Sequence, residues 1–560
     1  MAHKRYALGI DFGTESGRAL LVDVDTGEEV ATSVHLYADG VLDEYLPDGR
    51  TKLDHDTALQ NPADWLDALR RTVPAVLEQA GATPQQVIGI GVDFTSCTVL
   101  PVDRDGTPLC FHGRWRSRPH AWAKLWKHHA SQPEADKINE AAARRGERFL
   151  ARYGGKISSE WAIPKMWQVL DEDPEVFAAA DRFIEGGDWI VFKLCGREAR
   201  SSCMAGYKGM WARDEGFPSP DFLKDLDPRL ERLIEKKFST DIRPLGEKAG
   251  ELTGEGASLC GLVPGIAVGV AIIDAHAAVP ASTVTEGGKM VMVMGTSTCH
   301  MLLSREKVIV PGMAGVVEDG ILPGFFGYEA GQAATGDIFA WFIDNCVPAA
   351  YEKEAAESGT TIHRLLESKA AGLRPGESGL IALDWWNGNR SVLVNAGLSG
   401  LLLGCALTTK PEEVYRALIE ATAFGTHKII LTFKEHGIEI DELYACGGLP
   451  ERNQLLVQIY SDVTGLEMKL AASGQPSALG AAMLGAVAAG KTAGGYDTPG
   501  EAAAKMARVK DKVFRPDAQA HKVYQALYKE YETLHDYFGR GANDVMRRLK
   551  ALKARAGGED

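Results

Sequence analysis

One pattern constrains the fold of this chain most, because it occurs twice: once near the start and once near the middle. A buried strand, a Gly-Thr turn and a return strand are predicted around Ile10-Asp-Phe-Gly-Thr14, and Val293-Met-Gly-Thr296 repeats the arrangement. A similar hairpin at the opening of each half indicates a duplicated fold. Because one hydrophobic core usually stops growing near about 250–300 residues, 560 residues are expected to form two large domains. We place their boundary near residue 284.

Strands alternate with helices in both halves, which predicts α/β layers. The segment 119–170, rich in Trp, Lys and His, is expected to be an inserted helical subdomain. The predicted strands are 7–12, 18–23, 30–36, 87–93, 99–102, 264–273, 289–294, 299–303 and 442–445, and the predicted helices are 61–78, 453–462 and 476–484.

Composition limits the partners of the chain. It has 61 Lys and Arg against 76 Asp and Glu, a net charge of −15, so a general surface for nucleic acid or an anionic membrane is not expected. A bound phosphate must then be held locally by backbone N–H groups, a metal ion or a few placed cations. The nine cysteines show no metal-binding spacing, and no apolar run approaches 18 residues. We therefore expect a cytoplasmic protein with reduced thiols.

A stretch near the C terminus matches the Walker A pattern letter by letter: Gly485-Ala-Val-Ala-Ala-Gly-Lys-Thr492. A phosphate-binding loop of that type needs a strand before it and a helix after it. Here a small-residue helix precedes the motif and loop residues follow it, so we reject a phosphate site. Gly490 is instead expected to end the helix, with Lys491 near the negative end of its dipole.

The Gly-Thr hairpins are better candidates for binding phosphate. A turn such as Gly13-Thr-Glu-Ser16 can aim successive N–H groups and hydroxyls at an anion. A third Gly-rich turn, Gly447-Gly448, follows a predicted strand and leads into a helix. Its position fits the base and ribose of a nucleotide.

Three motifs together carry a resemblance to a known family: Ile10-Asp-Phe-Gly-Thr14, Met294-Gly-Thr-Ser297 and Gly447-Gly-Leu-Pro-Glu-Arg-Asn453. They resemble the phosphate-1, phosphate-2 and adenosine motifs of the FGGY carbohydrate kinases, members of the actin/Hsp70/sugar-kinase superfamily. The resemblance runs over nearly the whole chain. It implies an α/β fold of two duplicated ribonuclease-H-like domains, 1–284 and 285–560, which flank an interdomain catalytic cleft and carry helical insertions. The stretches that resemble pentulose-phosphorylating members are 91–98, 124–129, 154–161, 205–208, 274–278, 327–332 and 383–389.

The resemblance also implies the roles of individual residues. Asp274 would be the general base and would also contact the sugar, and Asp11 would hold Mg²⁺. Ser96, Lys208 and Glu329 would contact sugar hydroxyls. The residues that would bind ATP are Gly13, Thr14, Ser16, Gly295, Thr296, Gly336, Gly447, Gly448 and Asn453.

Each assignment has a simpler alternative. Asp274 could merely cap a helix, Asp11 could be a satisfied turn carboxylate, and an isolated Lys208 or Glu329 is usually a solvated surface charge. We favour the catalytic interpretation because these residues lie within family motifs.

The expected activity is ATP- and Mg²⁺-dependent phosphorylation of a pentulose. The chain departs from the family pattern at Ala271-Ile-Ile273 and at Ser96, so a different pentulose or a pentitol is the alternative substrate. An actin- or chaperone-like ATPase, or a sugar sensor without turnover, is the alternative from a different class. The expected partners are the sugar and ATP, with neither nucleic acid nor membrane. The resemblance also implies a homodimer.

Overall fold

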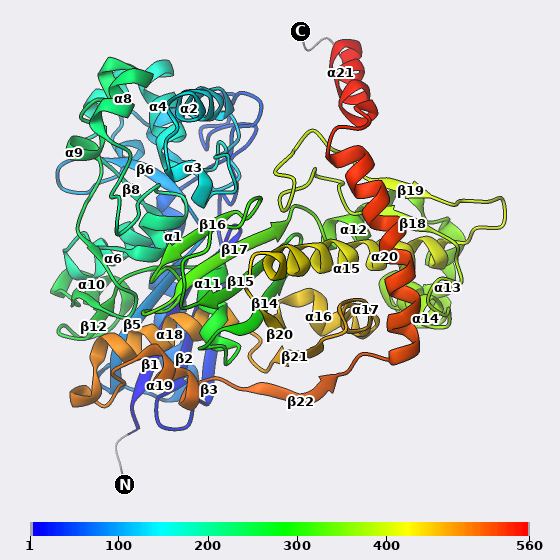
Figure 1. The fold of residues 1–560 in the computed structure, drawn as a ribbon. Helices are drawn as coiled ribbons and strands as arrows, with labels where there is room; N and C mark the ends of the chain where they lie inside the picture. Colours follow the sequence, from blue (N-terminus) through cyan, green and yellow to red (C-terminus); the bar gives the residue numbers. More distant parts are fainter. Residues whose placement is uncertain (1–3, 558–560) are drawn as a thin grey trace.

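The computed structural model describes residues 4–557, which form two mixed β-sheets with helices on their faces (Figure 1). In spatial order the first sheet contains β11 (Lys248–Glu251), β12 (Ala267–Gly269), β5 (Val87–Phe94), β1 (Tyr6–Phe12), β2 (Ser16–Asp23) and β3 (Glu29–Leu36), and β13 (Ile272–Ile273) also pairs with β5. The second sheet contains β16 (Gly315–Glu318), β17 (Phe326–Gln332), β15 (Thr298–Ser304), β14 (Gly288–Met294), β20 (Ile440–Cys446), β21 (Glu467–Ala471) and β22 (Val509–Phe514).

The two sheets share one topology. In the first, β1 pairs antiparallel with β2 and parallel with β5, and β5 pairs parallel with β12. In the second, β14 pairs antiparallel with β15 and parallel with β20, and β20 pairs parallel with β21. An antiparallel third strand follows each hairpin, β3 in one sheet and β17 in the other. The predicted duplication is therefore confirmed.

The helices of the first half are α1 (Pro62–Ala80), α2 (Gln132–Arg145), α3 (Phe149–Arg152), α4 (Ala162–Glu172), α5 (Pro174–Ala179), α6 (Gly186–Cys195), α7 (Ser202–Tyr207), α8 (Pro220–Leu226), α9 (Leu233–Lys237), α10 (Gly254–Cys260) and α11 (Asp274–Ala281). Those of the second half are α12 (Gly336–Cys346), α13 (Ala349–Glu357), α14 (Ile362–Ala371), α15 (Pro411–Glu435), α16 (Gly448–Arg452), α17 (Gln454–Thr464), α18 (Pro476–Ala489), α19 (Pro499–Met506), α20 (Ala518–Gly539) and α21 (Val545–Gly557). The short strands outside the two sheets are β4 (Leu59–Gln60), β6 (Val99–Val102), β7 (Ala123–Lys124), β8 (Arg182–Glu185), β9 (Arg200–Ser201), β10 (Ile242–Arg243), β18 (Ile381–Leu383) and β19 (Leu401–Leu403).

Two sequence predictions need correction. The strand expected over 264–273 is broken into β12 and β13, because Val270 turns aside and donates its N–H to the carbonyl of Glu247. The segment 119–170 contains no α-helix before Gln132, only a short 3₁₀ helix at Pro119–Ala121. A short strand and turns come first, and β7 joins β4, β6 and β8 in a small sheet. The helices that follow enclose a hydrophobic core of their own, which includes Trp122, Trp161 and Trp167.

The first sheet is covered on both faces by helices from opposite ends of the sequence. Alternate residues of a strand point to opposite faces. Ile10 and Phe12 pack in the core that contains Trp65 of α1, whereas Ala7 packs with Leu479 of α18. After completing most of the second sheet, the chain thus returns to the first (Figure 1).

Several glycines permit the close approach of α18. A Cβ atom on Gly9 would lie 1.8 Å from the carbonyl oxygen of Ala478, and one on Gly91 would lie 1.8 Å from that of Ala481. On the helix itself, a Cβ on Gly485 would lie 2.6 Å from the Gly91 nitrogen. These residues must stay glycine for helix and sheet to pack at this distance.

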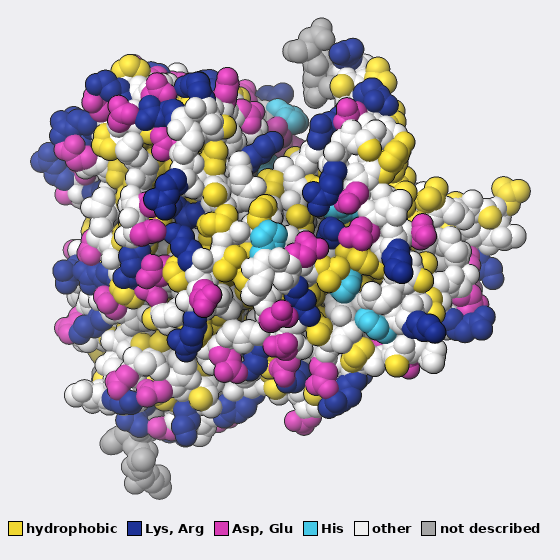
Figure 2. All heavy atoms as spheres, viewed as in Figure 1, with side chains coloured by type: hydrophobic (Ala, Val, Ile, Leu, Met, Phe, Trp, Pro, Cys, Tyr) yellow, Lys and Arg dark blue, Asp and Glu magenta, His cyan; other side chains and the backbone are white. Residues whose placement is uncertain are grey.

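No helix among the described residues is both long and apolar enough to cross a membrane. Figure 2 shows one face of the molecule, on which Lys and Arg are interspersed with Asp and Glu rather than gathered into one basic area. The basic helix α21 projects from the body beyond α20 (Figure 1).

Candidate active site

Three carboxyl groups lie at the carboxyl ends of neighbouring parallel strands. Asp11 on β1 is in register with Asp93 on β5, and Asp93 is in register with Ile272 on β13. Asp274 follows β13 directly and is the first residue of α11. The carboxyl edge of a parallel sheet is where ligands of open α/β folds bind.

Asp274 has the electrostatic properties of a general base. Burial, and next the charge of Asp11, raise the pKa of Asp274 to about 7, although Lys208 acts in the opposite direction. Its Oδ1 accepts a hydrogen bond of 2.7 Å from the N–H of Ala275. The cap residue of α11 is Ile273, and no side chain caps this helix. The carboxylate is therefore not a conventional helix cap.

The first Gly-Thr turn lies beside Asp11 and is held from both sides. Gly13 donates its N–H to the carbonyl of Ser16 at 3.0 Å. The indole of Trp126 donates to Oγ1 of Thr14 at 3.0 Å, and the amide of Gln60 donates to the carbonyl of Thr14 at 2.7 Å. These contacts fix the turn.

Arg18 joins this turn to the metal candidate. Its Nη2 donates to Oγ of Ser16 at 3.1 Å, and its Nε lies 3.3 Å from Oδ2 of Asp11. Burial raises the pKa of Asp11, and the Arg18 charge opposes that rise. Arg18 therefore places a positive charge beside a turn that is a candidate for binding phosphate.

The second Gly-Thr turn meets two other predicted nucleotide contacts. Gly336, at the start of α12, donates its N–H to the carbonyl of Gly295 at 3.0 Å, and a Cβ there would lie 2.6 Å from that oxygen. Gly447 has φ +98°, and a Cβ on it would lie 2.5 Å from the carbonyl oxygen of Met294. Gly295 and Thr296 are exposed, as is Gly448. Their backbone groups are thus accessible to a ligand.

Asn453 has a different environment from these glycines. It is buried and caps α17, with Oδ1 accepting from the N–H of Leu456 at 2.9 Å. Its Nδ2 donates to the hydroxyl of Tyr415 at 3.2 Å. The side chain therefore holds α17 in place beside the Gly447–Gly448 turn.

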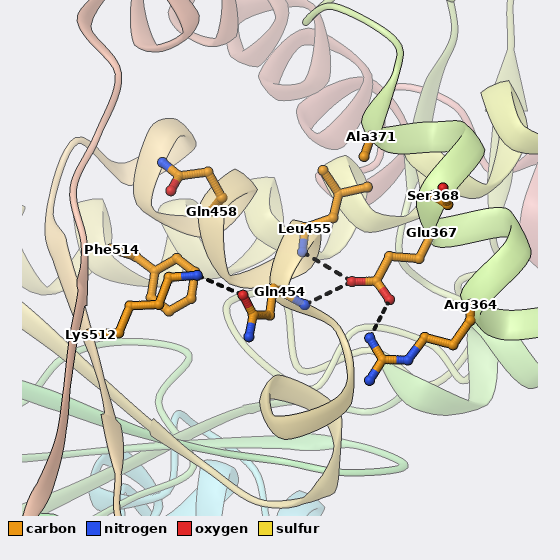
Figure 3. A pocket seen from close by; sticks show the side chains of 9 residues that line it. All are labelled: Arg364, Glu367, Ser368, Ala371, Gln454, Leu455, Gln458, Lys512 and Phe514. Carbon is orange, nitrogen blue, oxygen red and sulfur yellow. Dashed lines mark hydrogen bonds and ion pairs between the residues drawn. The ribbon is translucent and has the colours of Figure 1, made fainter.

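A cavity of about 450 Å³ lies next to α17 (Figure 3). It is lined by Arg364, Glu367, Ser368, Ala371, Gln454, Leu455, Gln458, Lys512 and Phe514. Glu367 accepts a hydrogen bond from the N–H of Gln454 at 2.9 Å, and Lys512 donates to Oε1 of Gln454 at 2.6 Å. None of the predicted nucleotide contacts lines this cavity, so we do not assign it to ATP.

The predicted sugar contacts Lys208 and Glu329 are both buried and each has an ionic partner. Lys208 Nζ lies 2.5 Å from Oε2 of Glu160, and Glu329 pairs with Arg390. The Nε2 atom of His276 lies 3.2 Å from the other oxygen of Glu329. Neither residue is a solvated surface charge.

The charges of this cluster act on one another. Burial alone would raise the pKa of Glu160, but Lys208 and Arg390 lower it to about 2. Burial would also raise the pKa of Glu329, which Arg390 and His276 instead hold far below its usual range. Both carboxylates are therefore held in the ionised form, which can accept hydrogen bonds but not donate them.

Ser96, the third predicted sugar contact, follows the carboxyl end of β5. Its buried Oγ has no hydrogen-bond partner among the described residues. The segment Ala271-Ile-Ile273, where the chain departs from the family pattern, is buried in the core of the first sheet. Its side chains contribute to packing.

The charged residues of the site that sequence reasoning missed include Asp93, Glu160 and Arg390. Each lies in or beside a stretch that carries the family resemblance. The partners of Lys208 and Glu329 could not be identified because they are 48 and 61 positions away in the sequence. Asp93 could have been identified from the sequence, because a charged residue in an otherwise apolar predicted strand is rarely buried without a function.

No group of three or more His, Cys, Asp or Glu residues in the described part of the chain could hold a metal ion by itself. Mg²⁺ usually needs only one or two carboxylates, with waters and substrate phosphates completing its coordination. The oxygen ligands at Asp11, next to a candidate phosphate turn, fit that pattern.

Two family models match the sequence. The N-terminal domain of the FGGY family of carbohydrate kinases matches residues 6–280, and the C-terminal domain of that family matches residues 290–489. The boundary that we expected near residue 284 falls in the interval between them and stays a prediction.

Individual proteins resemble the chain over nearly its whole length. A ribulokinase of Halalkalibacterium halodurans is 59% identical, with 98% of each chain covered, and a ribulokinase of Geobacillus thermodenitrificans is 58% identical, with 99% and 98% covered. Among solved structures, a xylulose kinase from Rhodospirillum rubrum superposes with a TM-score of 0.77 at 22% identity, covering 95% of this chain and 98% of that one. At this identity the superposition supports the fold alone, which is the predicted two-domain α/β fold.

Proposed function

Since the chain belongs to the FGGY family of carbohydrate kinases, we propose that it transfers the γ-phosphoryl group of ATP to L-ribulose and forms L-ribulose 5-phosphate. That it is a carbohydrate kinase follows from the family. The choice of L-ribulose is supported by relatives named ribulokinase at 58–59% identity. We place the reaction in L-arabinose catabolism.

The observation that carries the mechanism is the position of Asp274. It directly follows β13, which pairs with β5, and the charges of Asp11, Lys208 and Glu329 all influence its pKa. Phosphoryl transfer requires little covalent chemistry from the protein, so positioning and charge stabilisation dominate. In our mechanism the Asp274 carboxylate accepts the proton of the sugar's 5-hydroxyl as that oxygen attacks the γ-phosphorus.

The remaining roles follow from the same geometry. Lys208 and Glu329 donate to and accept from sugar hydroxyls, and Glu160 and Arg390 hold them in place. The Gly13 and Gly295 turns supply backbone N–H groups to the phosphates of ATP, and Arg18 adds a positive charge. Asp11 would hold Mg²⁺, which neutralises phosphate charge when bound.

A kinase acting on another pentulose or a pentitol is the second candidate. The unpartnered hydroxyl of Ser96 supports it, because one added hydroxyl in a sugar pocket can change which substrate is preferred. Family membership favours either kinase over an actin-like ATPase or a sugar sensor.

The test is a coupled ADP-release assay with L-ribulose, D-ribulose, D-xylulose, ribitol and glycerol. We expect the highest kcat/KM with L-ribulose and little ADP release without a sugar. A higher kcat/KM with another acceptor would refute the choice of L-ribulose and leave the mechanism standing. Sugar-independent ATP hydrolysis at the same rate would refute the kinase mechanism.

A further inference from the structure

Asp93 is a buried carboxyl group that the mechanism above does not use. It is fully buried in the central strand β5, and neither of its oxygens has a hydrogen-bond partner among the described residues. A buried carboxylate without a partner costs considerable free energy. An unpaired buried polar group of this kind needs an explanation, and a bound ion is one.

Two other buried aspartates each have a hydrogen-bond partner, although Oδ1 of Asp188 has none among the described residues. Asp188 accepts a hydrogen bond of 3.1 Å from Arg200, and Asp384 accepts from Gln332 at 2.8 Å and from Tyr531 at 2.9 Å. Asp93 lies in register with Asp11 on the neighbouring parallel strand, and the charges of Asp11 and Asp274 both act on it. Arg18 is the cation that acts on the pair, and it contacts Asp11. Two neighbouring acidic groups in a buried setting need either a proton or a cation between them.

The surroundings favour a divalent cation for that place. Both carboxyl groups lie at the end of parallel strands, directly before the Gly13–Ser16 turn and Ser96. The carboxyl groups provide only oxygen ligands, which suit a hard ion such as Mg²⁺. A pair of carboxylates plus phosphate oxygens is also a usual protein contribution to a Mg²⁺–nucleotide site.

We propose that Asp93 is a second carboxylate of the magnesium site and acts with Asp11 to hold the Mg²⁺ that accompanies ATP. The inference rests on the proposed function, since it takes the nucleotide to bind at the Gly13 turn. It assigns this role to a residue of β5, a strand that carries none of the three nucleotide motifs.

The first test measures Mn²⁺ binding by electron paramagnetic resonance in the presence of ADP, so it does not depend on turnover. We compare the wild type, Asp93→Asn and the control Asp23→Asn. Asp23 is buried on the same sheet at the end of β2, and its Oδ1 accepts from the N–H groups of Asp25 and Thr26. We expect Asp93→Asn to weaken Mn²⁺ binding by at least about 10-fold, as even outer-shell changes do, and the control to leave it unchanged.

Unchanged Mn²⁺ affinity in Asp93→Asn would overturn the inference, provided that the wild type binds Mn²⁺ with ADP. If the wild type itself shows no ADP-dependent Mn²⁺ binding, the proposed nucleotide site fails, and this inference fails with it. Asp93→Ser, a smaller side chain without charge, gives the same comparison if the Asn variant does not fold.

The second test is thermal unfolding with and without Mn²⁺ and ADP. Without them, Asp93→Asn should unfold at the wild-type temperature or higher, because it removes one of two acidic groups that lie in register on neighbouring buried strands. With them, it should lose most of the ligand-induced rise that the wild type shows. A variant that is less stable without ligand, yet shows the full wild-type rise, would mean that Asp93 has only a structural role.

Discussion

A single residue, Asp274, tests the mechanism most directly. We expect Asp274→Asn to keep its affinity for sugar and ATP and to lose turnover by about 100-fold to 10,000-fold, because the isosteric amide cannot accept the proton. Steady-state kinetics and calorimetric binding measure the two effects separately. Turnover close to that of the wild type would remove Asp274 from the mechanism.

The pKa of Asp274 also predicts how activity depends on pH. Burial and Asp11 raise this pKa to about 7, and the base must be ionised to act. The value of kcat/KM for the sugar should therefore fall as pH drops through about 7, with a slope of one. A profile that stays flat from pH 8 to pH 5 would contradict this assignment.

Lys208 predicts how the sugar is held. Loss of a charged hydrogen bond costs about 1.5–3 kcal/mol, so Lys208→Met should raise the KM for L-ribulose roughly 10-fold to 150-fold, with a much smaller effect on the KM for ATP. The control is Lys224→Met, an exposed lysine that pairs with Glu231 on the surface.

The ionic partner of Lys208 gives a further check. Lys208→Met leaves Glu160 without its closest cation, which should lower stability. Adding Glu160→Gln should restore stability without restoring the KM for L-ribulose. Recovery of both properties would mean that Lys208 acts only through Glu160, and a wild-type KM in the single variant would place the sugar elsewhere.

At this scale the sequence could nominate residues for the candidate site but not predict how they are arranged. Motif resemblance identified Asp274, Lys208 and Glu329, and the structure brings their charges together. It could not identify Arg390, because an arginine far along the chain becomes a partner only through the folding of the second half.

Among the secondary-structure elements, α18 makes the sharpest prediction. Helix propensity alone says that Gly485→Ala should stabilise the protein by up to about 1 kcal/mol. The added Cβ would lie 2.6 Å from the backbone of β5, so we expect instead a loss of about 1–3 kcal/mol or more. Urea unfolding gives the sign. Stabilisation would show that α18 does not pack this closely on the sheet.

The matched control is Lys491→Ala, at the other end of the Walker-like motif. Its side chain is exposed and pairs with Asp497 and Glu501. It should leave stability, ATP affinity and turnover nearly unchanged. A large loss of ATP affinity in this variant would mean that the Walker-like motif does bind phosphate.

Element prediction succeeded where periodicity and turn residues agreed. The strands β1 and β14 and the helix α1 lie within one or two residues of their predicted bounds, and Gly490 ends α18 with φ +73°. The prediction failed over 264–273, since an apolar run carries no signal for a break within a buried strand.

For the whole molecule, we predict that the first half does not fold by itself. A fragment of residues 1–284 lacks α18, which covers one face of β1 and β5. We expect this fragment to aggregate and the co-expressed fragments 1–284 and 285–560 to form a soluble complex. Size-exclusion chromatography measures both. A monomeric, cooperatively unfolding 1–284 fragment would contradict the prediction.

The duplication of the fold could be predicted from sequence because both hairpins carry the same Gly-Thr signature. The return of the chain to the first sheet, as helix α18, could not be predicted from sequence. A small-residue helix such as α18 has no amphipathic pattern that indicates which sheet it covers, and its glycines have meaning only opposite Gly9, Gly89 and Gly91.

That return also sets the order of events during synthesis. The first sheet leaves the ribosome early, but the helix that covers it begins at Pro476, about 200 residues after β13. At a synthesis rate of ~5–20 residues per second, the face of β1 and β5 that α18 covers therefore stays exposed for roughly 10–40 s. An apolar surface exposed for that long is a binding site for chaperones. The nascent chain, rather than the finished enzyme, is therefore the form of this protein most exposed to aggregation.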